Sequence, residues 1–351
     1  MPRLKDLRAR FLTLGTAAVG VLVFAFLGLP LPFLFGPMAA CLIAALAGVR
    51  LKGVGQISVA ARTILGVAVG ASITPALLHQ LPLMAASLAL IPIYIALIAA
   101  IGVPFFTRVC KFDPVTAFYA AMPGGLQDMV IFGAEAGGNV RILSLVHATR
   151  VLIVVTIAPI LLVKLYGVSL SNPIGAPAST IPLHELALMA LAALIGWKGG
   201  ERVGLFGASI LGPMIVAAIF SLMGWIHMRP PAEAILTAQY FIGMAIGIYY
   251  VGVTLRELRQ VVVSGVAFVV LLALLATVFA EIVILAGFAP AVEAFLAYAP
   301  GGQAEVTVLA IVAGADLGFV ITHHLARIIL VITGAPLAAR YFGAAKKGPP
   351  A

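Results

Sequence analysis

Residues 122–155 read MPGGLQDMVIFGAEAGGNVRILSLVHATRVLIVV, and residues 299–332 read APGGQAEVTVLAIVAGADLGFVITHHLARIILVI. The two stretches share Pro-Gly-Gly, an acid five residues after the proline, and His-x-x-Arg beginning nineteen residues after the acid. Chance similarity between apolar segments does not readily explain so many shared features at one offset, here 177 residues. The sequence therefore predicts an internal duplication.

The duplication extends outward from these stretches. LFGPMAACLIAALAG at 34–48 resembles ILGPMIVAAIFSLMG at 210–224, and GVAVG at 66–70 resembles GMAIG at 243–247. The offset is 176 residues in the first pair and 177 in the second, so the register holds with one single-residue gap. We predict a first membrane repeat at 1–168, a Ser/Pro/Gly-rich linker at 169–182, a second repeat at 183–342 and a tail at 343–351.

The composition is that of a membrane protein. Hydrophobic residues make up 63% of the chain and charged residues 9%, whereas soluble domains carry about 25% charged residues. At about 20 residues per span, the apolar runs leave room for about ten transmembrane helices. We expect these spans at 11–29, 32–49, 56–78, 82–106, 141–166, 183–197, 204–224, 231–253, 261–287 and 317–339.

The two segments interrupted by Pro-Gly-Gly, 114–137 and 290–313, decide the orientation of the repeats. If they cross the membrane, the repeats are parallel; if they enter and return on one side, each repeat has five spans and the repeats are inverted. The inverted arrangement places most loop lysines and arginines on the cytoplasmic side, which the positive-inside rule favours. The predicted fold is an all-α polytopic membrane protein of two inverted five-helix repeats, each with a re-entrant Pro-Gly-Gly hairpin. Both termini are expected in the cytoplasm and the linker in the periplasm.

Ionisable residues inside predicted spans are costly and usually mark a pathway or a binding site. The free amide groups where a helix restarts after Pro-Gly-Gly attract an anion, and glycine permits close approach and positive φ. Arginines can hold a carboxylate in bidentate fashion. We therefore expect a substrate site formed by Pro123, Gly124, Gly125, Gln127, Arg150, Pro300, Gly301, Gly302, Gln303 and Arg327. The expected ion-coupling residues are Asp128, Glu305, His147 and His324.

Structural interpretations of the same residues stay open. Each acid and the arginine of its own repeat could form a buried ion pair that holds the hairpin to the following helix. The histidines could be hydrogen-bonding partners in helix packing. The Gly-Pro pairs at 36–37 and 212–213 are expected to shape helix starts. Asn139 and Asp316 are expected to be N-caps, and His323 has no counterpart in the first repeat.

Other classes of partner have little support. The formal net charge is +9, but the basic residues lie in short loops and at the ends, so we expect no nucleic-acid partner. Cys41 and Cys110 lie in or beside apolar runs without metal-ligand spacing. We expect no cofactor and no bound metal.

The duplicated segments also resemble a known family. FGPMAACLIAALAG, AMPGGLQDMVIFGAEAGGNVRILSLVHATRVLIVV and their partners in the second repeat are similar to the AbrB duplication family of bacterial membrane proteins. The resemblance covers most of the chain and implies a bacterial inner-membrane location. Old labels of such proteins, ammonia monooxygenase and transcription regulator, find no matching metal-site spacing or soluble DNA-reading segment in this sequence.

The leading functional prediction is a secondary transporter, coupled to H⁺ or Na⁺, for a small anionic solute, with elevator-type movement as a fold-level analogy. One alternative is a membrane enzyme or metal-dependent oxidoreductase that uses the Asp/Glu/His cluster. Another is a regulator that transports nothing. The expected partners are a small molecule or ion and the lipid bilayer, and the sequence leaves a homodimer open.

Overall fold

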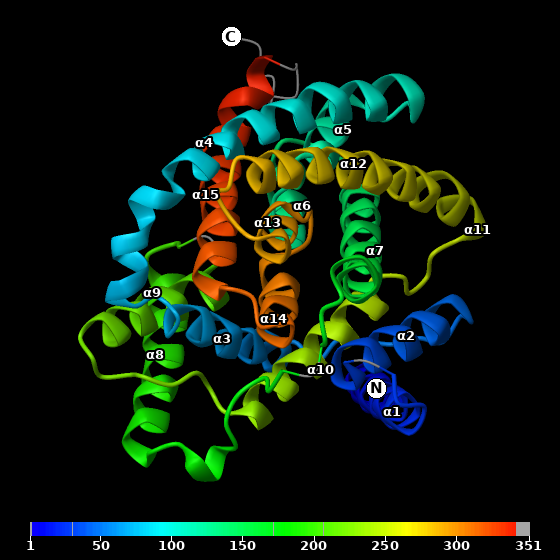
Figure 1. Cartoon of the computed structure of the whole chain (residues 1–351). Helices are drawn as coiled ribbons and strands as arrows, with labels where there is room; N and C mark the ends of the chain where they lie inside the picture. Colours follow the sequence, from blue (N-terminus) through cyan, green and yellow to red (C-terminus); the bar gives the residue numbers. More distant parts are fainter. Residues whose placement is uncertain (1, 30, 171, 206, 342–351) are drawn as a thin grey trace. The chain divides into compact units, whose positions relative to one another are not determined.

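The computed structural model describes residues 2–29, 31–170, 172–205 and 207–341, and the predicted tail at 343–351 lies outside these ranges. Every regular element within them is helical (Figure 1). In chain order these are α1 (Pro2–Phe26), α2 (Pro32–Leu46), α3 (Gln56–Gly70), α4 (Pro75–Pro104), η1 (Phe105–Val109), α5 (Pro114–Ala121), α6 (Leu126–Glu135), α7 (Val140–Tyr166), η2 (Ala178–Thr180), α8 (Leu183–Arg202), α9 (Ala208–Leu222), α10 (Ala232–Ile248), α11 (Leu255–Glu257), η3 (Leu258–Val262), α12 (Val263–Leu285), α13 (Ala291–Tyr298), α14 (Gln303–Ala313) and α15 (Leu317–Tyr341).

Five stretches of the described chain are long and apolar enough to cross a membrane: Asp6–Phe26, Leu77–Val109, Val140–Tyr166, Leu255–Leu285 and Leu317–Ala335. Four other expected spans correspond to the shorter apolar helices α2, α3, α9 and α10. At about 1.5 Å per residue these measure roughly 22–26 Å, less than a hydrocarbon core of about 30 Å. Within the described residues, five of the roughly ten expected spans are therefore long and apolar enough to cross a membrane.

The expected span at 56–78 is wrong as a single helix. Helix α3 ends at Gly70, and α4 begins at Pro75. The Thr74 hydroxyl accepts a hydrogen bond from the Leu77 amide at 3.4 Å, as a helix N-cap does. Because proline has no amide hydrogen to lose, Pro75 suits the first position of a helix.

The helices form two compact units, and each unit takes segments from both halves of the chain. Unit 1 consists of 1–79, 169–253 and 311–318, and unit 2 of 80–168, 254–310 and 319–351, of which 342–351 are not described. We call residues 1–168 the first half and 183–342 the second half. The compact units therefore do not follow the boundary between the halves.

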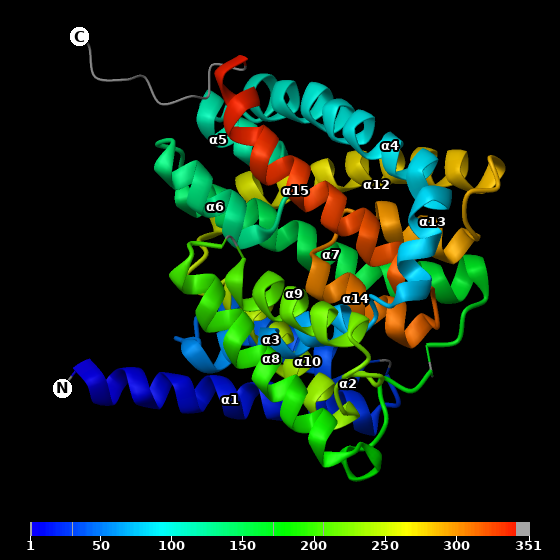
Figure 2. The same cartoon turned by 90° about the vertical axis from the view of Figure 1, so that its left-hand side faces the viewer.

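Unit 1 is built on helix crossings at glycines. A Cβ on Gly20 of α1 would lie 2.1 Å from the carbonyl oxygen of Gly36 in α2. A Cβ on Gly196 of α8 would lie 2.4 Å from the carbonyl oxygen of Gly212 in α9, and these two helices lie side by side (Figure 2). The expectation that Gly-Pro shapes a helix start is wrong, because Pro37 and Pro213 lie inside α2 and α9. The glycine instead lets two backbones touch.

A second set of glycine contacts joins the two halves within unit 1. In α3, a Cβ on Gly66 would lie 2.4 Å from the Ile210 carbonyl oxygen of α9. In α10, a Cβ on Gly243 would lie 2.1 Å from the Leu34 carbonyl oxygen of α2. These contacts correspond to each other at the offsets of the sequence similarity. The duplicated GVAVG and GMAIG segments thus supply glycines at GxxxG spacing that let helices pack closely.

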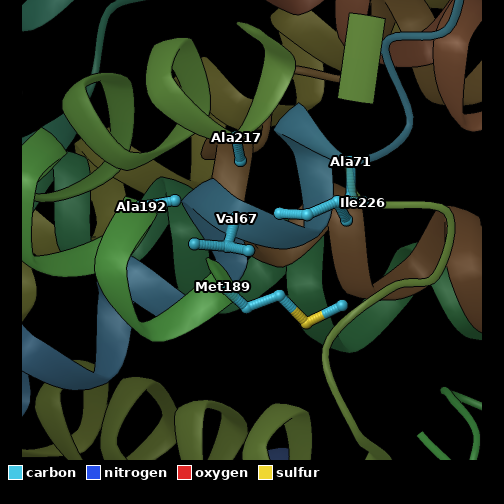
Figure 3. Packing of buried hydrophobic residues seen from close by; sticks show 6 residues of the cluster. All are labelled: Val67, Ala71, Met189, Ala192, Ala217 and Ile226. Carbon is cyan, nitrogen blue, oxygen red and sulfur yellow. The ribbon is translucent and has the colours of Figure 1, made fainter. Parts of the chain in front are cut away.

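Small apolar side chains fill the space beside these crossings. Figure 3 shows one cluster to which α3, α8, α9 and the loop after α9 contribute. Its buried members are Val67, Ala71, Met189, Ala192, Ala217 and Ile226.

Unit 2 contains both interrupted helices. Helix α7 packs against α5, α6 and α12, and α12 also packs against α13. An ion pair of 2.9 Å between Arg141 Nε and Glu257 Oε1 joins the start of α7 to α11. The first and second halves therefore contact each other here as well.

Candidate functional site

Both Pro-Gly-Gly segments interrupt a helix, as the sequence predicts. Helix α5 ends at Ala121 and α6 begins at Leu126; α13 ends at Tyr298 and α14 begins at Gln303. The residue before each proline, Met122 or Ala299, is extended with ψ of 133° or 131°. The proline ring disfavours the helical conformation at the preceding residue, which stops the helix.

The glycines serve close approach rather than positive φ, so that part of the expectation is wrong. Positive φ occurs at other glycines but not at the four of these motifs. A Cβ on Gly124 would lie 2.7 Å from the Met129 side chain, and one on Gly301 would lie 2.8 Å from Val306. Glycine is needed here because the first turn of the new helix folds over it.

The acids lie over the second glycine of each motif. A Cβ on Gly125 would lie 2.2 Å from an Asp128 carboxylate oxygen, and a Cβ on Gly302 would lie 2.2 Å from one of Glu305. Each acid stands in the first turn of its helix, and both are partly exposed. A carboxylate at this position is stabilised by the positive end of the helix dipole. Each restarted helix thus carries its own anionic group at its N-terminus.

The two arginines hold the carbonyl ends of the interrupted helices. Arg150 Nη1 donates to the Met122 carbonyl at 3.2 Å, and its Nη2 donates to the Gly124 carbonyl. Arg327 donates in the same way to the carbonyls of Ala299 and Gly301, at 2.8 Å each. Both arginines are 2% exposed, so the carbonyls and guanidinium groups satisfy each other away from solvent.

The histidines one turn earlier make the corresponding contact. His147 Nε2 lies 3.0 Å from the Tyr119 carbonyl oxygen, and His324 Nε2 lies 2.9 Å from that of Leu296. A carbonyl accepts only, so Nε2 carries the hydrogen in both rings. His324 Nδ1 also accepts from Arg327 Nη2 at 2.9 Å. This bond assigns His324 a neutral tautomer, which favours a positioning role over proton carriage.

The first half lacks the histidine–arginine bond. His147 Nδ1 and Arg150 Nε are buried and have no hydrogen-bond partner within the described chain. Arg327 Nε has none either. The contacts to the carbonyls are therefore shared by the two halves, while the bond within the helix belongs to the second half.

Unit 2 brings the predicted charged residues into one electrostatic neighbourhood. Arg150 interacts electrostatically with Arg327, Glu305 and Asp128. Pro123 and Pro300 are buried beside them, and Gln303 is 8% exposed. The side chain of Gln127 lies outside the described part of the structure. Asn139 caps α7, as predicted, through a 3.1 Å bond from the Ile142 amide, and Asp316 directly precedes α15.

A group of hydroxyl residues and one histidine near this site forms no motif in the sequence. Tyr94 Oη donates to the Tyr298 carbonyl at 3.0 Å, and Tyr298 Oη donates to the Ser87 carbonyl at 2.7 Å. The Ser87 Oγ lies 2.9 Å from His323 Nε2. All four residues are 0% exposed. Their sequence signal is a polar side chain inside an apolar run; at the offset of 177, Ser87 matches Ser264, while Tyr94, Tyr298 and His323 match apolar residues.

The metal alternative finds no cluster to support it in the part of the chain that is described. No three side chains of His, Cys, Asp or Glu gather there in a way that could hold a metal ion. His147 and His324 instead direct Nε2 at backbone carbonyls.

Comparison with known proteins identifies the family. A family model described as "Transition state regulatory protein AbrB" matches residues 33–343. The chain is 27% identical to "Uncharacterized protein YhjN" of Bacillus subtilis (strain 168), covering 92% of this chain and 90% of that protein. It is 25% identical to "Putative regulator AbrB" of Escherichia coli (strain K12), covering 89% of this chain and 90% of that protein. No solved structure matches. Because the family model spans most of the sequence, the chain belongs to the AbrB family.

Proposed function

We propose that this protein is a secondary transporter for a small anionic solute, coupled to H⁺ or Na⁺, in the bacterial inner membrane. The observation that carries the proposal is the recurrence, in one compact unit, of an interrupted helix with an acid at its restart and a buried arginine on its carbonyl end. Buried ionisable groups in membrane proteins are expensive and typically functional. Interrupted helices are typical of substrate sites in secondary transporters.

The proposal includes inverted repeats with re-entrant hairpins. The two halves make corresponding contacts at glycines in unit 1 and at the arginines in unit 2. These contacts support two structurally equivalent repeats. Two such repeats in opposite orientation can exchange conformations, which gives inward-open and outward-open states of similar energy. The basic residues of the loops support cytoplasmic termini.

The acids are the groups that we assign to coupling. When ionised, Asp128 and Glu305 each place a carboxylate over the N-cap glycine and satisfy the helix dipole themselves. When protonated, they leave two helix N-termini and two guanidinium groups without neutralising charge. A solute anion is then favoured at the same place. Because protonation of the acids precedes binding of the solute anion, anion binding is coupled to proton uptake.

The arginines have a supporting role in this scheme. Their Nη atoms already bond carbonyls, so they hold the interrupted helices in shape and supply positive potential. The division into two compact units, each with segments of both halves, suits an elevator-type carrier in which one unit moves as a body. Unit 2 would be the moving unit because it carries the charged groups.

Reconstituted proteoliposomes test the proposal. We expect a panel of small mono- and dicarboxylates to produce electrical currents or uptake that depend on a pH or Na⁺ gradient. The double variant Asp128→Asn with Glu305→Gln should retain binding and lose the dependence on the gradient, because its side chains cannot ionise. Gradient-driven uptake that is unchanged in this variant would exclude the acids as the coupling groups. Absence of uptake for every anion in the panel would contradict the substrate class.

A regulatory function is the second candidate. It rests on the names of the family and of the Escherichia coli relative, which call those proteins regulators. Regulation without transport predicts that purified protein in vesicles moves no solute under any gradient. It also predicts that removing the buried charges alters stability without changing any flux.

A further inference from the structure

The two interrupted helices are not held equally, although their arginine contacts correspond. In the second half, the C-terminal end of α13 is tied to α4 by two hydroxyl bonds. Tyr94 Oη donates to the Tyr298 carbonyl, and Tyr298 Oη donates to the Ser87 carbonyl. The rings of Tyr94 and Tyr298 also meet at 5.5 Å in an edge-to-face arrangement.

Helix α15 joins the same group. His323 Nδ1 donates to the Phe319 carbonyl at 2.9 Å, since a carbonyl accepts only. His323 Nε2 lies 2.9 Å from Ser87 Oγ, and the same hydroxyl lies 2.9 Å from the Met84 carbonyl oxygen, to which it donates. Together with the Arg327–His324 bond, these contacts connect α4, α13 and α15 through buried polar atoms.

An equivalent network cannot form at α5, the helix that corresponds to α13. At the offset of 177 residues, Ala121 stands for Tyr298, Leu271 for Tyr94 and Val146 for His323. The end of α5 packs instead by apolar contact with Gly102 of α4. A Cβ at Gly102 would lie 2.8 Å from Ala121 Cβ and 2.7 Å from the Phe268 ring. Lipid tails are as apolar as these side chains, so apolar packing between helices has no hydrophobic driving force in a membrane, whereas buried hydrogen bonds keep their value.

We infer that the first-half interrupted helix, α5–α6, is the one that opens, while Ser87, Tyr94, Tyr298 and His323 position α13–α14 and hold it closed. The difference in local stability follows from the contacts alone. Its use as a gate rests on the proposed transport function. In that function, access to the charged groups passes through α5–α6, and α13–α14 forms the fixed side of the site.

Hydrogen exchange of the full-length protein in lipid nanodiscs tests this inference without a substrate. At the strength typical of hydrogen bonds between helices in a membrane, two hydroxyl bonds lower the equilibrium constant for local opening about tenfold. We therefore expect the amides of 122–135 to exchange about tenfold faster than those of 299–310. Equal rates, or faster exchange in 299–310, would overturn the inference.

The double variant Tyr94→Phe with Tyr298→Phe keeps both rings and removes both hydroxyls. We expect exchange in 299–310 to rise about tenfold, to the rate of the first-half segment, with 122–135 unchanged. Tyr119→Phe, at a tyrosine of α5, is the matched control and should leave 299–310 unchanged. If the double variant left 299–310 as slow as in the natural protein, the hydroxyl bonds would not be what holds that helix. If the double variant lost transport while 122–135 still exchanged faster than 299–310 by the same factor, the gate role would be contradicted. The structural difference between the two interrupted helices would remain.

Discussion

Units 1 and 2 are stabilised by opposite means. In unit 1, glycines bring backbones into contact, as at Gly20 with Gly36 and at Gly243 with Leu34. In unit 2, buried arginines and histidines bond the carbonyls of interrupted helices. The glycine crossings bring helices together without a charged side chain at the contact, whereas the contacts at the interrupted helices use buried guanidinium groups. Under the proposed function, unit 1 would be the supporting unit and unit 2 the unit that carries the charged groups.

The largest effect is expected from removing an arginine of unit 2. Arg327→Ala leaves the carbonyls of Ala299 and Gly301 and the His324 ring without their donor. Unsatisfied buried acceptors cost about 1–3 kcal/mol each, so we expect a loss of roughly 3–5 kcal/mol and poor expression. Thermal unfolding in detergent measures it. Arg202→Ala, at an exposed position of α8, should change stability by less than about 0.5 kcal/mol.

A different outcome would change the comparison. If the double variant Glu305→Gln with Arg327→Gln regained expression and retained full proton-coupled uptake, this pair would be structural and the working site would lie elsewhere.

The next effect belongs to unit 1. Gly20→Ala places a methyl group 2.1 Å from the Gly36 carbonyl oxygen, and two backbones must separate to admit it. We expect destabilisation of about 1–3 kcal/mol. Gly15→Ala in the same helix meets nothing within 4 Å, so it should be neutral or stabilising by up to about 1 kcal/mol. Opposite signs for the two alanines in a thermal unfolding assay would support the crossing; equal signs would contradict it.

A smaller effect compares the two arginines. Lysine keeps the charge but cannot span two carbonyls as a planar guanidinium does. Arg327→Lys also loses the bond to His324, which Arg150 does not make with His147. We expect Arg327→Lys to destabilise by about 1–2 kcal/mol, and Arg150→Lys by about 0.5–1 kcal/mol less, roughly one hydrogen bond. Equal losses would show that the additional bond of the second half adds nothing.

The smallest effect is expected at the ion pair between Arg141 and Glu257, whose side chains are 41% and 28% exposed. A double-mutant cycle with alanine should give a coupling of about 0.2–1 kcal/mol that declines with added salt. The more exposed pair Lys198–Glu201 provides the control and should couple less. A coupling well above 1 kcal/mol would mean that this contact between the two halves is shielded from solvent.

Much of the site was predictable because its signals are local. Pro-Gly-Gly stops a helix wherever it stands, and the spacing of His and Arg places both on one helical face. The carbonyl partners of Arg150 were not predictable, since a guanidinium pairs equally well with a carboxylate by sequence criteria. The function of Gly36 was missed because its significance depends on the neighbouring helix, α1.

The sequence alone determined the apolar all-helical character, the two helix interruptions and the repeated acid, histidine and arginine, because these follow from composition, proline stereochemistry and periodicity. The tertiary structure decided that each compact unit combines segments of both halves. It also decided that Asp128 and Glu305 lie over their own N-cap glycines, and that hydroxyl bonds of Tyr94 and Tyr298 hold α13 but have no equivalent at α5. Such contacts join residues far apart in the chain, and their geometry depends on how the helices cross, which no local pattern encodes.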